Sequence, residues 1–192
     1  KNINQTIDEL KDIVGVANIL TNKWSMQSYV KGWRYGEGEA LAVAKPSTLI
    51  QVWNLLKLCV EKNIIVIMQA ANTGLTGGST PYGYDYDRPI LIINTLAIND
   101  IHFLDKGRQV IGFAGSTLFE LEDRLSEYNR EPHSVIGSSC VGASIVGGVC
   151  NNSGGALVKR GPAYTGTFKN SWVAVAKTPG ARGGGEGSYP YS

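Results

Sequence analysis

The chain has 192 residues and a formal net charge of +2 at pH 7, and 18% of its residues are charged. This length suits one sizeable domain, and so small a net charge argues against nucleic acid or an anionic membrane as the main partner. The three cysteines are odd in number and lack C-x-x-C spacing, so we expect neither a disulfide framework nor a metal site, and a reducing compartment fits best. No run of about 18 apolar residues predicts a spanning helix, and the N-terminus lacks a signal-peptide pattern.

The N-terminal part alternates between helical and irregular patterns. Ile7, Leu10 and Val14 mark one helical face and predict a helix over Thr6–Val14. Residues 21–39 mix aromatic and basic side chains with glycine, and we interpret them as an irregular surface segment. The apolar run Ala40–Ala44 predicts a buried strand.

The clearest local pattern follows at Thr48. Thr48 and Gln51 form a capping box. Leu49, Trp53, Leu56 and Val60 then recur at helical spacing, which predicts an amphipathic helix over Thr48–Lys62. A β-branched strand over Ile64–Met68 comes next, and the order strand, helix, strand indicates an α/β layer with a crossover helix.

A glycine-rich stretch, Gln69 to Pro81, follows this strand. From Ala70 to Ser79 it holds three glycines, three hydroxyl residues and one asparagine, with no acidic residue. Glycine allows close backbone approach, successive backbone N–H groups form an anion site, and the hydroxyls and the amide add neutral donors. The stretch is therefore either a diphosphate cradle or a plain turn between two strands.

The following elements are predicted with ordinary patterns. Ile90–Ile93 is a buried strand, and Asn99–Asp105 with Gln109–Phe113 forms a hairpin. Thr117 and Glu120 form a second capping box, which starts an amphipathic helix that reaches to about Tyr128.

A second unusual stretch runs from Pro132 to Gly155. It contains six glycines and five serines with almost no charge. Small residues allow either a flat ligand or another backbone to approach closely, so a ligand site and tight helix packing are both compatible with it. Two such stretches in one domain favour a large, extended ligand.

Several common sites are absent from the sequence. Neither stretch holds the P-loop pattern, and neither carries G-x-G-x-x-G followed by an acidic residue. The chain lacks the G-x-S-x-G nucleophile elbow. His102 and His133 are not at metal-ligand spacing, and His133 is either a ligand contact at the entrance to the second stretch or a structural histidine.

The two stretches resemble those of a known family. Residues 70–81 resemble the first pyrophosphate loop of the FAD-binding domain of the p-cresol methylhydroxylase (PCMH) and vanillyl-alcohol oxidase type. Residues 131–155 resemble its second flavin-contacting segment, and the order of the two agrees. The similarity is greatest to the quinone-dependent D-lactate dehydrogenases of bacteria, and runs from about Asp12 to Thr165.

The resemblance implies an α+β fold, a PCMH-type domain of two α/β subdomains that binds FAD without a covalent bond. It implies oxidation of D-lactate, with electrons passed to a quinone, in the complete enzyme. Catalytic residues stay unassigned. The implied FAD-binding residues are Ala70, Ala71, Asn72, Thr73, Gly74, Gly78, Ser79, Gly137, Ser144 and Gly154.

Beyond Thr165 the resemblance stops, and residues 166–192 include a Gly-rich segment without a core-forming pattern. We therefore expect a partial FAD-binding domain over 1–165, a divergent tail, and no substrate domain, as in a truncated or frame-shifted product. Such a chain would be cytoplasmic, and the complete enzyme would lie peripherally on the cytoplasmic face of the inner membrane, through parts that are missing here. Alternatives are another flavoprotein with this domain or a non-catalytic flavin-binding fragment.

Overall fold

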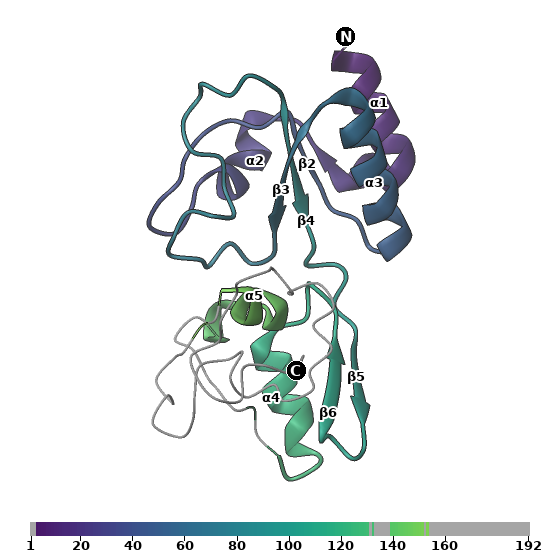
Figure 1. The fold of residues 1–192 in the computed structure, drawn as a ribbon, viewed down its shortest axis with the longest axis vertical. Helices are drawn as coiled ribbons and strands as arrows, with labels where there is room; N and C mark the ends of the chain where they lie inside the picture. Colours follow the sequence, from purple (N-terminus) through teal and green to yellow (C-terminus); the bar gives the residue numbers. More distant parts are fainter. Residues whose placement is uncertain (1–2, 131, 133–138, 152, 154–192) are drawn as a thin grey trace, which may run out of the picture. The chain divides into compact units, whose positions relative to one another are not determined.

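The structure is a computed structural model that describes residues 3–130, 132, 139–151 and 153. It consists of two compact units, residues 1–98 and 99–192, and each is described by itself (Figure 1). The predicted tail over residues 166–192 and two predicted flavin contacts, Gly137 and Gly154, lie outside the described residues. The predicted boundary at residue 165 therefore stays a prediction.

The first unit is built on a four-stranded sheet in the order β1-β2-β4-β3. Strands β2, β4 and β3 run parallel, and β1 pairs antiparallel to β2. The central strand β4 is buried along its whole length, as expected for a strand with neighbours on both sides and helices on both faces. The strand bounds are Ile19–Leu20 (β1), Ala42–Ala44 (β2), Ile65–Gln69 (β3) and Ile90–Asn94 (β4).

Helices cover both faces of this sheet. Helices α1 (Ile3–Val14) and α3 (Leu49–Lys62) lie side by side on one face, and α2 (Lys23–Val30) lies on the other (Figure 1). Leu10 and Leu55 pack with alternate residues of the strands in one core, and Met26 of α2 packs with the intervening strand residues in another. The predicted α/β layer with a crossover helix is confirmed, and with it the helix predicted at the N-terminus.

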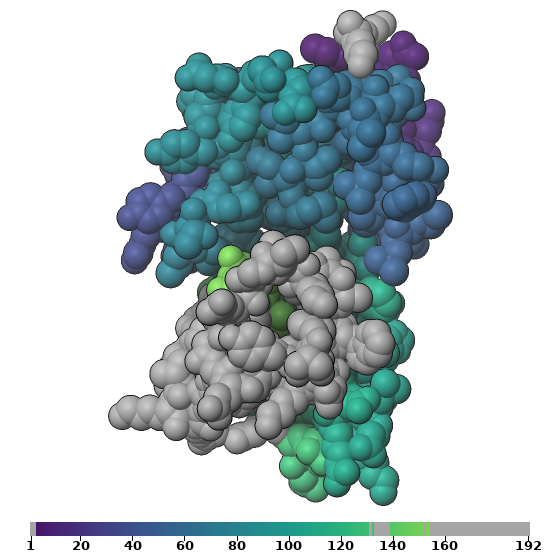
Figure 2. Space-filling model, in the orientation of Figure 1, coloured from purple at the N-terminus to yellow at the C-terminus, as the bar shows by residue number. Residues whose placement is uncertain are grey.

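Helix α3 is present where the sequence predicts it, but of its predicted apolar stripe only Leu56 packs, partly buried, against the core. Leu49, Trp53 and Val60 are 58, 58 and 83% exposed, whereas the buried residues are Leu55, Leu58 and Cys59. The blue atoms of this segment lie on the visible surface of the unit (Figure 2). Both sets recur at helical spacing because the helix is apolar on two sides, so spacing alone did not identify the side that contacts the sheet.

The prediction that residues 21–39 are irregular is wrong for α2. Asn22 caps this helix, because its side-chain oxygen accepts a hydrogen bond from the Trp24 N–H at 2.8 Å. Met26 is the one residue of α2 that is buried. A helix with so little apolar periodicity gives no pattern to detect, and its other stabilising contacts come from residues some 40 positions away.

The second unit combines a hairpin with short helices. The predicted hairpin is confirmed as strands β5 (Ile101–Leu104) and β6 (Gln109–Gly112), which pair antiparallel, and the predicted helix as α4 (Leu118–Ser126), which packs on them. The Thr117 hydroxyl accepts the Glu120 N–H at 3.1 Å and so caps α4. The predicted end near Tyr128 is two residues too late. Helix α5 (Ile145–Cys150) completes the described part of this core.

Candidate functional site

Loop 70–79 leaves the sheet at the carboxyl end of β3, the end of a parallel sheet where ligands characteristically bind. It has no regular secondary structure, and it carries no charged side chain. The adjacent turn over residues 31–38 forms one wall of it, since the Tyr35 backbone lies against Gly77 and Gly36 lies against Thr80. The loop is therefore a neutral segment fixed against a second segment.

The backbone N–H groups of the loop are free to bind a ligand. From Ala71 to Ser79, none donates a hydrogen bond to another residue in the described part of the chain. Unpaired N–H groups at successive residues attract an anion, because each presents a partial positive charge without the bulk of a side chain. The part of the cradle formed by Ala71, Asn72, Thr73, Gly74, Gly78 and Ser79 thus has the donors that a diphosphate requires.

At two positions of the loop, neither the packing of the described residues nor the backbone conformation requires a glycine. A Cβ atom at Gly74 or Gly78 would meet no described heavy atom within 4 Å, and neither residue has a positive φ. Gly77 differs, because its φ is +74° and its Cβ position lies 3.4 Å from the Tyr35 carbonyl oxygen. Open space beside Gly74 and Gly78 fits the close approach of a ligand to the backbone.

The side chain of Asn72 is used inside the protein. Its amide nitrogen donates to the carbonyl oxygens of Lys31 at 2.8 Å and Ser28 at 3.2 Å, at the end of α2. Its side-chain oxygen accepts the Ser79 hydroxyl at 2.8 Å. Asn72 also has a left-handed backbone, with φ +56°. Because both amide hydrogens are engaged, the neutral side-chain donor expected from the sequence is not available, and Asn72 offers a ligand its backbone N–H.

Gln69 is a residue of the site to which the sequence pattern gave no role. It is 3% exposed. Its side-chain nitrogen donates to the carbonyl oxygens of Ser79 at 2.7 Å and Tyr29 at 2.9 Å. The buried Asn94 amide donates to the Gln69 side-chain oxygen at 3.4 Å and to the Ala70 carbonyl at 2.9 Å. The sequence feature that could have indicated a role for Gln69 is its polar side chain at the end of an otherwise apolar strand.

The second stretch supplies one described candidate, Ser144, in the second unit. Ser144 is buried, and its hydroxyl oxygen accepts the Gly147 N–H at 3.0 Å, which makes it the N-cap of α5. The structure therefore shows a structural role for this hydroxyl. Whether Ser144 also contacts a flavin stays a prediction.

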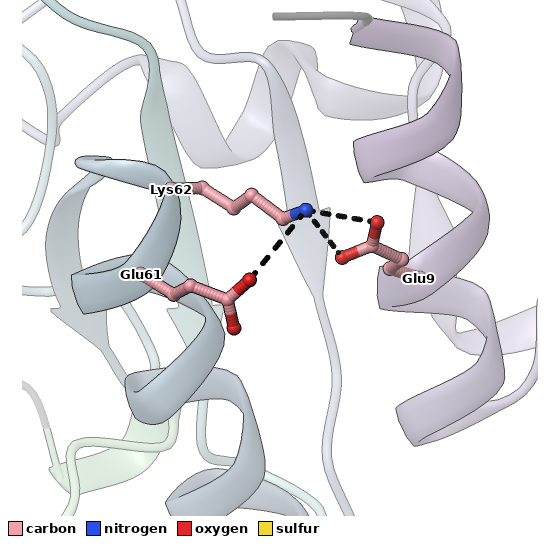
Figure 3. A network of polar contacts seen from close by, with 3 residues as sticks. All are labelled: Glu9, Glu61 and Lys62. Atoms are coloured by element: carbon pink, nitrogen blue, oxygen red, sulfur yellow. Dashed lines mark hydrogen bonds and ion pairs between the residues drawn. The ribbon is translucent and has the colours of Figure 1, made fainter.

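A separate hollow lies at the opposite, amino ends of β3 and β4. This pocket of about 340 Å³ is lined in part by Lys62, Ile64 and Pro89. The Lys62 ammonium lies 2.9 Å from the Glu9 carboxylate and 3.9 Å from Glu61, and so joins α3 to α1 (Figure 3). The hydrogen bond to Glu9 raises the pKa of Lys62, against the opposing effect of burial and with a further contribution from the two carboxylate charges. The Lys62 ammonium is therefore paired within the fold and is not available to bind a ligand.

Membrane and metal features were also sought in the described residues. None of their helices is both long and apolar enough to cross a bilayer. They also contain no group of three or more His, Cys, Asp or Glu side chains arranged to hold a metal ion.

Known proteins are similar to this chain in sequence and in fold. A family model described as "FAD binding domain" matches residues 40–165. A quinone-dependent D-lactate dehydrogenase of Haemophilus influenzae is 59% identical over 163 residues, which are 85% of this chain and 29% of that protein. The protein of the same name from Escherichia coli is 55% identical over 159 residues, which are 83% of this chain and 28% of that protein.

Solved structures agree on the fold. A p-cresol methylhydroxylase structure gives a TM-score of 0.65 at 21% identity and covers 79% of this chain and 30% of its own. An alkyldihydroxyacetonephosphate synthase gives 0.71 at 16% identity and covers 83% and 31%. The α+β, PCMH-type fold expected from the sequence is confirmed. The chain spans less than a third of the curated relatives that it matches.

Proposed function

Because the chain belongs to the FAD-binding domain family, we propose that loop 70–79 receives the diphosphate of FAD, as part of a quinone-dependent D-lactate dehydrogenase. The observation that carries the assignment to this loop is the run of unpaired backbone N–H groups from Ala71 to Ser79. The open space beside Gly74 and Gly78 supports it, because the phosphates can approach the backbone there.

The described residues contribute binding and orientation. When bound, FAD would accept the hydride that leaves the C2 carbon of a 2-hydroxy acid. The loop stabilises the two phosphate charges with N–H dipoles and places no acidic side chain beside them. Gly137, Ser144 and Gly154 are proposed to line the flavin from the second segment.

D-lactate and quinone are proposed as substrate and electron acceptor of the complete enzyme, from the names of the relatives. Those relatives are more than three times as long as the matched region, so we place the catalytic groups in parts that this chain does not match. We expect this chain alone to retain FAD weakly and not to turn over D-lactate. For the complete enzyme we propose a peripheral position on the cytoplasmic face of the inner membrane.

Purification of the chain followed by a visible spectrum and FAD titration tests the proposal. We expect saturable FAD binding with little flavin retained through a desalting column. D-lactate should not bleach the bound flavin. Absence of saturable binding would count against the FAD assignment for this chain, and bleaching by D-lactate would show that the chain contains a complete active site.

A second function is kept open by the partial coverage. The same domain occurs in relatives named for another 2-hydroxy acid, such as a D-2-hydroxyglutarate dehydrogenase of Bos taurus that is 31% identical over 143 residues. In that case the complete enzyme would reduce its flavin with a different substrate. A comparison of D-lactate with other 2-hydroxy acids on the full-length protein separates the two, because only the correct substrate reduces the flavin rapidly.

A further inference from the structure

We infer that Gln69 is a positioning residue for loop 70–79, and that its carboxamide sets the distance between the two ends of the loop without itself binding FAD. The inference rests on the FAD role proposed above. It concerns a side chain that precedes the loop and carries none of the N–H groups attributed to the cradle.

The first step is the closure of the loop. The Gln69 side-chain nitrogen donates to the carbonyl oxygen of Ser79, ten residues later, at 2.7 Å. At the same residue, the Gln69 main-chain oxygen accepts the N–H of Thr95 at 2.8 Å, which fixes the backbone to the residue directly after β4. Gln69 therefore does two things. Its main chain fixes the start of the loop to the sheet, and its side chain fixes Ser79, the last residue of the loop, to that start.

The second step is the attachment to α2. The other hydrogen of the Gln69 carboxamide goes to the Tyr29 carbonyl at 2.9 Å, in the last turn of α2. The carbonyl groups in the last turn of a helix have no partner within the helix, so this bond satisfies one of them. Gln69 consequently holds the loop against both the sheet and the helix.

The third step is burial. Gln69 is 3% exposed, so its carboxamide is shielded from water. If the carboxamide were removed, its partner groups would be left without a hydrogen bond, and the folded chain would be less stable. Asn94 donates to the Gln69 side-chain oxygen and to the Ala70 carbonyl, and this fixes the orientation of the carboxamide, with the nitrogen toward Ser79 and Tyr29. The carboxamide has no N–H left for a ligand, so any effect on FAD must act through the shape of the loop.

The test uses the complete 192-residue chain with three variants. Gln69→Met removes the polar group and keeps the length, and Gln69→Glu keeps the shape and removes the donors. Asn18→Ala is the matched control, because the Asn18 amide donates at 2.8 Å to the Val14 carbonyl in the same unit, away from the loop. The measurements are the 1H–15N heteronuclear NOE of residues 71–79 without ligand, and the dissociation constant for FAD.

We expect both Gln69 variants to lower the NOE of the loop amides selectively and to weaken FAD binding by roughly tenfold or more. Asn18→Ala should leave both measurements unchanged. Loop NOE values that stay at the wild-type level in Gln69→Met and Gln69→Glu would overturn the inference, as would an equal loss in Asn18→Ala. If the wild-type chain fails to bind FAD, the proposed function is contradicted, while the NOE comparison still decides the role of Gln69.

Discussion

The side-chain oxygen of Asn72 accepts the Ser79 hydroxyl at 2.8 Å, so two residues seven positions apart form a bridge across the inside of loop 70–79. With Asn72 also bonded to the end of α2, the loop is held at its third residue, and the Gln69 side chain holds its last residue. Its backbone N–H groups are thus arranged before a ligand arrives, and FAD binding need not be opposed by the full entropy cost of ordering a flexible loop.

The glycines of the loop should separate binding from folding. We expect Gly74→Ala and Gly78→Ala to weaken FAD binding by tenfold or more while the unfolding temperature stays the same or rises slightly, because the new methyl group faces open space. Gly77→Ala should instead lower the unfolding temperature, because φ is +74° there. FAD titration and thermal unfolding of the three variants check this. Equal thermal destabilisation of all three would contradict it.

Asn72 should contribute to stability through its side chain and through its backbone. Asn72→Gly removes the three hydrogen bonds and should lower the free energy of unfolding by about 1–3 kcal/mol. Asn72→Ala should cost about 1 kcal/mol more, because alanine resists a left-handed backbone. Urea unfolding measures both differences.

Asn129 is a matched control for that comparison. Its φ is +53°, and its exposed side chain makes no hydrogen bond to another described residue. Asn129→Ala should therefore show the backbone cost, and Asn129→Gly should be close to neutral. If Asn72→Gly were also neutral, the bonds from Asn72 to α2 would not contribute to stability.

The two sides of α3 should respond differently to truncation. Leu55→Ala should lower the free energy of unfolding by about 2–5 kcal/mol, because Leu55 is 0% exposed. Trp53→Ala should cost less than about 1 kcal/mol, because that side chain is 58% exposed. Chemical denaturation of the two variants checks the order. The reverse order would mean that the stripe predicted from sequence is the buried one after all.

Lys62 should stabilise the fold over a defined pH range. Since its pKa is raised in the folded chain, its ion pair with Glu9 contributes fully below the unfolded pKa of lysine, near 10.5, and is lost as pH rises through the folded pKa. Lys62→Met should therefore lower the unfolding temperature near neutral pH, and the difference from wild type should shrink above about pH 10.5. Lys57→Met, at an exposed position of the same helix, is the matched control and should leave the unfolding temperature near neutral pH almost unchanged.

The cysteines should differ in reactivity. Burial raises the pKa of the Cys59 thiol to about 11, so at pH 8 roughly one molecule in a thousand carries the thiolate. Cys140 is exposed. A thiol reagent at pH 8 should modify Cys140 rapidly and Cys59 very slowly, with the site identified by mass spectrometry. In denaturant the two rates should become similar, and rapid native labelling of Cys59 would show that its core opens readily.

Local patterns in the sequence predicted strands β2 to β6 and the two helices capped by Thr48 and Thr117, but not β1 or α5. Thr48 and Thr117 cap helices where expected, because a capping hydroxyl acts on residues within one turn. Helix α2 was missed, and the outward face of α3 was mistaken, because both depend on contacts with residues far along the chain.

The assignment of the candidate site to loop 70–79 stays a prediction, and the side-chain bonds that hold this loop could not be predicted from the sequence. Glycine content and the lack of acidic residues identified loop 70–79, and these features act through the backbone. The bonds from Gln69 to Tyr29 and from Asn72 to Lys31 span about 40 residues, and one sequence gives no sign of such pairs. For the same reason, the sequence could not show that the Asn72 amide is already engaged.

The carboxamides that hold the loop carry no charge. Gln69 and Asn72 do not titrate, and their hydrogen bonds are not screened by dissolved ions as ion pairs are. The proposed attraction between the loop and the doubly charged diphosphate of FAD is electrostatic and would depend on ionic strength. Salt should therefore change the affinity of loop 70–79 for FAD and leave the shape of the loop unchanged.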